Sequence, residues 1–370
     1  MSDGSAATAR GDRRGRPAPD TAHAYAALDL GTNNCRLLIA SPLSNGFQVL
    51  ESFSRIVRLG EGLSRSGRLD ERAQDRALAA LRVCADKLRR RRVRKVNAVA
   101  TQACRLALNG ADFVQRVEQE TGLRLRIISP REEARLAVAG CLNLLDRNDK
   151  AAIVVDVGGG STEVSWVDLR GLSLDLHDRN IHPSRAPIHA WVSLPIGVVT
   201  LAEQFPEHAD RQLWFRAMVD SVKTQLRAFD HADELKPLFE EGDGHIVGTS
   251  GAITSLAGLH LRLPRYDRNR VDGLWMTRED CQAAAGRLIA LDAGGRAAEP
   301  CIGPERADLV LGGAAILQAI QELWPCERVR VADRGLREGL LMSLMNEGPR
   351  PGRRRRGRRR PHGAPSPALA

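Results

Sequence analysis

The segment DVGGGSTE, residues 156–163, places a carboxylate at each end of a loop of three glycines and two hydroxyl residues. Such a loop can turn its backbone N–H groups toward one point, where they bind phosphate oxygens, while the hydroxyls supply further donors. Glycine is needed because a Cβ atom would block the close approach of a phosphate group. Carboxylates are tolerated beside a phosphate when a cation separates them, so Asp156 and Glu163 predict Mg²⁺, with Mn²⁺ as the alternative.

The same arrangement occurs twice more in weaker form. An apolar run that contains Asp29 leads into GTNN, residues 31–34, and a second run leads through GTSGAITS, residues 248–255, into a helical pattern. Taken alone, GTNN is explained equally well as an ordinary hairpin turn. Together, the three loops predict a phosphate-rich ligand in a cleft between two similar domains. The chain has no G-x-x-x-x-G-K-[ST] segment, which argues against a P-loop nucleotidase.

The elements that must position these loops alternate between strand and helix patterns. Short apolar runs predict strands at 25–30, 35–40, 47–55, 96–101, 123–128, 151–157, 163–169, 190–195 and 328–333. Helical spacing of apolar residues predicts a helix capped by Asp70 and further helices at 131–145, 277–291, 305–323 and 335–345. Residues 245–260 are predicted to form a strand, a turn and a helix. This alternation favours the α/β class.

The charge of the chain is concentrated at one end. The formal net charge is +10, but residues 350–370 hold eight arginines and no acid, so residues 23–349 are close to neutral. We expect residues 1–22 and 349–370 to be disordered. The Arg-rich tail is predicted to bind polyanions such as polyphosphate or nucleic acid by charge alone. A second basic run, residues 87–95, is favoured as a solvated helix end, with an electropositive approach for a polyanion as the alternative.

Several protein classes are excluded by composition. No run of 18 apolar residues is present, so no membrane span is expected. The N-terminal residues lack the apolar core of a secretory signal. The seven cysteines are scattered without a C-x-x-C pair, which predicts reduced thiols in a cytoplasmic protein. No histidine has the H-E-x-x-H spacing, and no Ser-His-Asp arrangement is indicated.

Six segments place the sequence in a known group. They occur in the order ALDLGTNNCRLLIA, ATQACRLALNGADF, IISPREEARLAVAG, VVDVGGGSTEVSWV, LPIGVVTLAEQF and IVGTSGAITSLAG. Together they resemble the exopolyphosphatase / guanosine pentaphosphate phosphohydrolase (Ppx/GppA) family, within the actin, Hsp70 and sugar-kinase superfamily. The resemblance implies two ribonuclease-H-like domains with an interdomain cleft. It also implies Mg²⁺-dependent hydrolysis of a terminal phosphate from polyphosphate or of the 5′ γ-phosphate from pppGpp.

The resemblance assigns roles to four acids. In PREEARL it implies that Glu133 is the general base that activates water, while Glu132 is better explained as a surface acid that pairs with Arg135. Asp156 and Glu163 match the metal-associated acids of the family. Asp29 matches the corresponding acid of the first domain, with a turn aspartate as the alternative.

The resemblance also implies the residues that hold the phosphate chain. Arg105 in CRLALN matches an arginine that grips phosphate oxygens and stabilises transition-state charge, against the alternative of a solvated helix arginine. The glycines are expected to offer backbone N–H groups and the other side chains to offer polar contacts. These substrate-binding candidates are Thr32, Asn33, Gly158, Gly159, Gly160, Ser161, Thr162, Ser250 and Gly251.

The chain is predicted to be a short form without the additional C-terminal HD-type domain of larger relatives. Domain I is expected to cover 23–130 with 333–348 returning to it, and domain II to cover 131–332. An exopolyphosphatase is the favoured function. A pppGpp 5′-phosphohydrolase and a non-catalytic polyphosphate- or nucleic-acid-binding regulator are the alternatives. The oligomeric state stays open, with a homodimer as one option.

Overall fold

The computed structural model describes residues 24–43, 46–171, 183–229 and 231–346. The predicted disordered segments, 1–22 and 349–370, lie outside these ranges, and so does the Arg-rich tail. Within the described ranges, no helix combines the length and the apolar composition that crossing a membrane requires.

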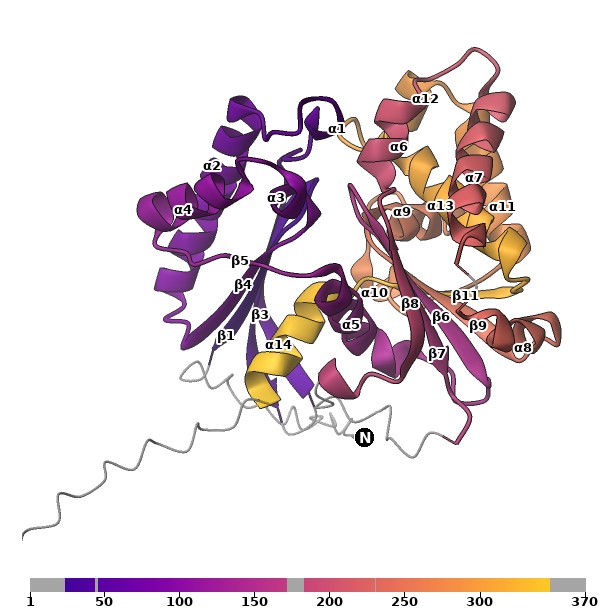
Figure 1. Cartoon of the computed structure of the whole chain (residues 1–370), viewed down its shortest axis with the longest axis horizontal. Coiled ribbons are helices and arrows are strands. Elements are labelled where there is room, and N and C mark those ends of the chain that lie inside the picture. The colour runs from indigo at the N-terminus through magenta and orange to yellow at the C-terminus, as the bar shows by residue number, and fades with distance from the viewer. Residues whose placement is uncertain (1–23, 44–45, 172–182, 230, 347–370) are drawn as a thin grey trace, which may run out of the picture.

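Two β-sheets form the frame of the molecule, and they lie side by side in Figure 1. The first sheet has the order β3-β2-β1-β4-β5. Its strands are β1 (Tyr25–Leu30), β2 (Asn34–Leu43), β3 (Gly46–Ile56), β4 (Lys95–Ala100) and β5 (Arg126–Ile127). β1, β2 and β3 are antiparallel neighbours, whereas β4 runs parallel to β1 and β5 parallel to β4.

The second sheet repeats this plan and adds one strand, in the order β10-β11-β9-β6-β7-β8. Its strands are β6 (Ala151–Val157), β7 (Thr162–Asp168), β8 (Ile188–Leu194), β9 (Gly244–Thr249), β10 (Trp275–Thr277) and β11 (Arg328–Ala332). β6, β7 and β8 are antiparallel, and β9 and β11 run parallel to β6. The predicted α/β fold of two ribonuclease-H-like domains is thereby confirmed.

Further helices pack around the two sheets. On domain I these are α1 (Leu63–Ser66), α2 (Glu71–Arg90), α3 (Gln102–Leu106) and α4 (Gly110–Thr121). On domain II they are α6 (Val198–Gln204), α7 (Arg211–Arg227), α8 (Lys236–Glu240), α9 (Gly251–His260), α10 (Arg268–Val271), α11 (Arg278–Ala290), α12 (Ala293–Ala298) and α13 (Val310–Leu323). The Asp70 side chain caps α2 as predicted, because it accepts hydrogen bonds from the N–H groups of Arg72 and Ala73.

Two helices lie between the sheets and connect the domains. Figure 1 shows α5 (Pro130–Cys141) and α14 (Leu336–Asn346) crossing there. Their backbones touch, since a Cβ atom on Gly140 would lie 2.0 Å from the carbonyl oxygen of Gly335, and one on Gly339 would lie 2.2 Å from that of Leu136. The predicted domain boundaries, near residues 130 and 333, fall where the chain enters these two helices.

The structure differs from the sequence-based elements at several points. The strand predicted at 123–128 pairs with β4 only at Arg126 and Ile127, because Leu123 and Leu125 turn into the core without joining the ladder. The helix predicted from 305 begins at Val310, after a turn in which Gly303 has a φ of 72°. The elements α1, α6, α7, α8, α10, α12 and β10 were not predicted.

The basic run at 87–95 lies far from the ends of β1 and β6 that carry the glycine loops. Lys95 pairs with Tyr25, the first residue of β1, whereas Asp29 lies near the last residue of that strand. The structure therefore does not support the alternative interpretation of this run as an electropositive approach to a cleft. Its helical part carries ion pairs instead, with Lys87 and Arg91 both contacting Glu51.

Candidate active site

A cavity of about 500 Å³ opens between the domains at the ends of β1, β6 and β9. The loops after β1 and β6 meet there, since a Cβ atom on Gly159 would lie 3.0 Å from the Cβ atom of Asn33. Most of the predicted site residues line this cavity. They are Asp29, Thr32, Asn33, Glu133, Asp156, Gly158, Gly159, Gly160, Ser161, Glu163, Ser250 and Gly251.

Thr162 is placed away from the cavity. Its side chain is fully buried, and its hydroxyl donates a hydrogen bond of 2.7 Å to the carbonyl oxygen of Ile196. Successive side chains of a strand point to opposite faces, so Thr162 and its neighbour Glu163 in β7 cannot both face the ligand. The expected substrate contact from the Thr162 hydroxyl is therefore corrected to a structural bond.

Arg105 lies behind Glu133 instead of on the cavity surface. One of its terminal nitrogens donates to the carbonyl oxygen of Ile128 at 2.8 Å and to Oε2 of Glu133 at 3.2 Å. Both side chains are largely buried, with 19% of the arginine and 10% of the glutamate exposed. In this structure Arg105 thus orients the predicted base, and its predicted grip on phosphate would require the side chain to move.

The acids of the cavity form a concentration of negative charge. Burial raises the pKa of Glu163 to about 7 and that of Asp156 to about 6, and in each case a neighbouring acid adds to the effect. Burial, followed by repulsion from Glu163, raises the pKa of Glu133 well above its ordinary value, against the influence of Arg105. Burial also raises the pKa of Asp29. A positive ligand would relieve this repulsion.

The donor set fits a hydrated divalent cation. Oδ1 of Asp29 is buried and has no hydrogen-bond partner. Among the described residues, no three His, Cys, Asp or Glu side chains stand close enough to form a complete metal site. Mg²⁺ needs only one or two carboxylates, because waters and phosphate oxygens supply its other ligands. Asp29 and Asp156 therefore supply the two carboxylates that Mg²⁺ needs, and Glu163 lies beside them. The three acids together do not enclose a metal ion completely.

The third loop presents a strained residue to the cavity. Ser250 has a φ of 108° and a ψ of 172°, a conformation that residues other than glycine seldom adopt. Its Oγ is buried without a partner, and it directly precedes the first residue of the ten-residue helix α9. A helix N-terminus attracts anions through its free N–H groups and its dipole. The strain and the unpartnered hydroxyl are consistent with the predicted phosphate contact.

Five arginines that line the same cavity were not predicted from the sequence. These are Arg36, Arg268, Arg306, Arg334 and Arg337. Arg36 in β2 lies opposite Asp29 in the β1–β2 register, and its charge counteracts the raised pKa of Asp29 and Asp156. The available signal was a lone arginine inside the apolar run CRLLIA, which follows the strand that carries Asp29 directly after GTNN.

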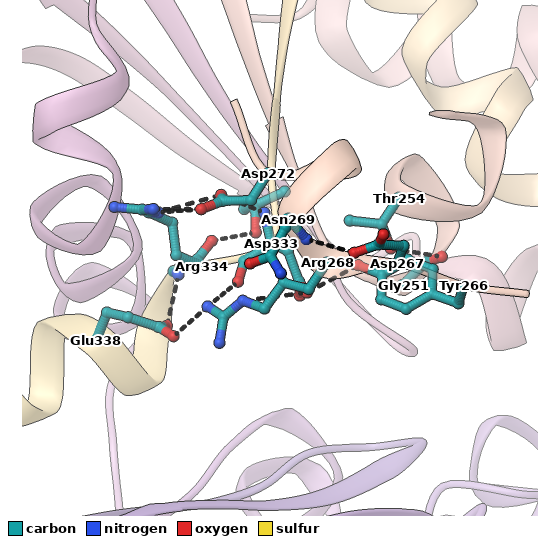
Figure 2. Close-up of polar contacts among 12 residues, drawn as sticks. Gly251, Thr254, Tyr266, Asp267, Arg268, Asn269, Asp272, Asp333, Arg334 and Glu338 are labelled. Carbon is teal, nitrogen blue, oxygen red and sulfur yellow. Dashed lines mark hydrogen bonds and ion pairs between the residues drawn. The ribbon is translucent and has the colours of Figure 1, made fainter. Parts of the chain in front are cut away.

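A polar network lies beside the cavity, and Figure 2 shows its contacts. Arg268 donates to the carbonyl oxygen of Asp333 at 2.6 Å and to Glu338 at 3.3 Å, and Tyr266 donates to the Asp333 side chain at 2.7 Å. Arg334 makes a two-pronged ion pair with Asp272. The network joins the segment around α10 to the start of α14, and it thereby fixes the helix that carries Arg337.

The two sheets and the cavity between them define a two-domain α/β protein of the actin-like class. A family model described as the Ppx/GppA phosphatase family matches residues 38–347, and the chain belongs to this family. Phosphatases of this family are hydrolases that act on phosphoanhydride bonds.

Solved structures agree with this assignment. A crystal structure of the Ppx/GppA family member of Aquifex aeolicus is 27% identical, with a TM-score of 0.69, over 87% of this chain and 97% of that chain. An exopolyphosphatase-like protein is also 27% identical, with a TM-score of 0.73, over 87% of this chain and 98% of the other. An exopolyphosphatase from Cytophaga hutchinsonii, at 23% identity and a TM-score of 0.73 over 88% and 98% of the two chains, shows the same fold.

Proposed function

We propose that this protein is a Mg²⁺-dependent exopolyphosphatase that removes the terminal phosphate of inorganic polyphosphate. The observation that carries the proposal is the position of Glu133. This buried glutamate faces the cavity that the glycine loop, Asp29 and Asp156 also line. A carboxylate held beside a phosphate cradle can orient a water molecule and take its proton.

Different residues of the cavity would bind phosphate, hold Mg²⁺ and activate water. The loops at 31–34 and 158–161, with Ser250, would hold the phosphate oxygens, and Arg36 would neutralise part of their charge. Mg²⁺ held by Asp29 and Asp156 would supply a Lewis acid to the bridging oxygens. Arg105 contacts Oε2 of Glu133, so we assign Oε1 to the attacking water.

A pppGpp 5′-phosphohydrolase is the second candidate, and a specific cavity favours it. A neighbouring space of about 460 Å³ shares Arg268 and Arg334 with the main cavity. Phe47 and Met342 give this space apolar walls, and Asn143 adds an amide. Such a lining suits a nucleoside attached to the phosphates.

Phosphate release from long-chain polyphosphate and from pppGpp, measured with Mg²⁺, tests both candidates. We expect Glu133→Gln to lower kcat by about 10²–10⁴-fold, the usual contribution of a general base. The matched control is Glu132→Gln, because Glu132 is the adjacent acid, lies at the surface and pairs with Arg126 at 2.7 Å. This control should retain wild-type kcat. Binding of polyphosphate without release of phosphate would instead support the non-catalytic regulator.

A further inference from the structure

A bridge across the outer edge of the cleft joins the two domains. Glu203 in α6 accepts hydrogen bonds from the backbone N–H of Gly62 at 2.9 Å and from the Ser64 hydroxyl at 2.5 Å. Gly62 and Ser64 belong to the start of α1 in domain I, and Figure 1 shows α1 facing α6. The Glu203 carboxylate thus uses both of its oxygens on the opposite domain.

A second contact reinforces the bridge from the same segment of domain I. Arg58 forms an ion pair of 3.2 Å with Asp308 and donates to the carbonyl oxygen of Glu305 at 3.2 Å. Arg58 and Asp308 are exposed, with 36% and 48% of their side chains accessible. Exposed pairs of this kind contribute little alone, so Glu203 is the stronger part of the bridge.

The domain I end of the bridge rests directly on the first phosphate loop. The N–H of Gly60 donates to the carbonyl oxygen of Thr32 at 2.9 Å, and the N–H of Val57 donates to that of Asn33 at 2.8 Å. A Cβ atom on Gly60 would lie 2.3 Å from Cγ2 of Thr32, so the two segments are in tight contact. A displacement of Gly62 is therefore transmitted to the loop that contains Thr32 and Asn33.

The domain II end rests in the same way on the glycine loop. The N–H groups of Val198 and Val199, the first residues of α6, donate to the carbonyl oxygens of Gly158 and Gly159 at 3.0 and 2.7 Å. A Cβ atom on Gly197 would lie 2.5 Å from the backbone of Gly159. The helix that carries Glu203 and the glycine loop consequently move together.

We propose that Glu203 is a positioning residue, which holds the two phosphate-binding loops at the separation that one phosphate chain requires. The assignment rests on the proposed function, because a phosphate chain must contact both loops at once. When the bridge is lost, the cleft spends less time closed, and the apparent affinity falls by the fraction of molecules that are competent to bind. Glu133 and its surroundings are unaffected, so the chemical step is preserved.

The test compares Glu203→Ala with Glu203→Gln by using tripolyphosphate as substrate. We expect Glu203→Ala to raise KM by roughly 3- to 10-fold with kcat unchanged or higher. Glu203→Gln retains an acceptor for the Gly62 N–H and should recover most of the wild-type KM. Glu240→Ala, which removes an exposed acid at the end of α8, is the charge-matched control and should leave KM unchanged. A drop in kcat at constant KM, or no effect on either constant, would overturn the proposal.

A double-mutant cycle isolates the contact itself. Ser64→Ala should raise KM less than Glu203→Ala does, and the combination with Glu203→Ala should add nothing further, because both changes remove the same bond. Additive effects would contradict a shared role for the two residues.

Measuring the distance between the two domains tests the bridge independently of catalytic activity. The cysteines of the described chain are all buried, so spin labels can be directed to the introduced pair Arg72→Cys and Gln212→Cys on α2 and α7. Mg²⁺ and tripolyphosphate should narrow the distance distribution in the otherwise unchanged protein, and Glu203→Ala should leave it broad. A distribution that narrows in the Glu203→Ala variant as much as in the wild type would refute the bridge. Narrowing without any hydrolysis would preserve the bridge while refuting the proposed activity.

Discussion

Asp29 and Arg36 lie directly opposite each other in the β1–β2 hairpin, and both side chains line the interdomain cavity. The pairing places a cation beside the acid that we assign to Mg²⁺, in a wall where Asp156 adds a second negative charge. Burial and repulsion from Arg337 lower the pKa of Arg36, while Asp29 and Asp156 oppose that change. A half-buried guanidinium held in this way is preorganised to receive phosphate oxygens.

Replacement of this arginine should weaken substrate binding. We expect Arg36→Gln to raise KM for polyphosphate by about 10- to 100-fold, the loss typical of a hydrogen bond to a charged group. Arg55→Gln, in the neighbouring strand β3, removes an exposed arginine from the same sheet and serves as the control. Steady-state kinetics at fixed Mg²⁺ would decide the matter, and equal effects of the two variants would count against the assigned role.

The strained serine should trade stability against activity. Ser250→Gly removes the cost of a φ of 108°, so thermal unfolding should show a gain of about 1 kcal/mol after allowance for the flexibility of glycine. The same variant loses the hydroxyl and should bind polyphosphate more weakly. Ser250→Ala loses the hydroxyl but keeps the strain, so it should lower affinity without a gain in stability. A stabilised Ser250→Gly variant with full affinity would show that the hydroxyl has no binding role.

The glycine contacts between α5 and α14 should tolerate no side chain. Gly339→Ala forces a Cβ atom against the backbone of Leu136, and we expect a loss of roughly 2–3 kcal/mol in the free energy of unfolding. The control is Gly286→Ala in α11, where no atom outside the adjoining helix backbone lies within 4 Å of the new methyl group. That change should stabilise the protein by about 0.5–1 kcal/mol through helix propensity. Denaturant unfolding of both variants measures the two changes in the free energy of unfolding, which should have opposite signs.

One ion-pair cluster of domain II should make stability depend on acid pH. Glu322 in α13 accepts hydrogen bonds from Arg216 at 2.7 Å and Lys223 at 2.5 Å. Burial opposes its ionisation, but the bonds from Lys223, Gln318 and Arg216 outweigh burial and lower its pKa to about 2. The stabilisation is therefore present above about pH 4.5 and is lost as the pH falls toward 2. Glu322→Gln should unfold on the order of 1–2 kcal/mol more easily than the wild type at pH 7, with a gap that shrinks at pH 3. A gap independent of pH would contradict this account.

The Arg-rich tail should affect binding but not the chemical step. We expect removal of residues 349–370 to leave kcat unchanged and to raise KM for long polyphosphate at low salt. The variant should also show a shallower dependence of KM on salt, because fewer counterions are released. Loss of kcat on truncation would show that the tail belongs to the active site.

Local patterns predicted most of the cavity. The glycine loop, Asp29 and the helix that begins with PREEARL are short segments whose residue types carry the chemistry, and the topology brings them together as expected. Thr162 was assigned to the wrong face because the loop was treated as one unit, although strand alternation starts at that residue. The helix α7 was also within reach, since Trp214, Met218 and Val222 repeat at helical spacing.

Other features depend on contacts between distant residues. The pair formed by Arg334 and Asp272 joins positions 62 residues apart, and the bond from Ser64 to Glu203 joins positions 139 residues apart. Neither pair leaves a periodic or motif-like trace in the sequence, because each partner is an ordinary surface-type residue. Such contacts become visible only when the two domains are placed against each other.

The backbone contact between α5 and α14 also determines how the two domains can move. Helices that touch at glycine leave no ridge of side chains to slide along, so a shear motion would drive Gly140 and Gly339 into the carbonyl groups that they face. Rotation about the point of contact breaks no such packing. We therefore expect the two domains to open by rotation about the contact between α5 and α14. Such a rotation would move the two phosphate-binding loops apart.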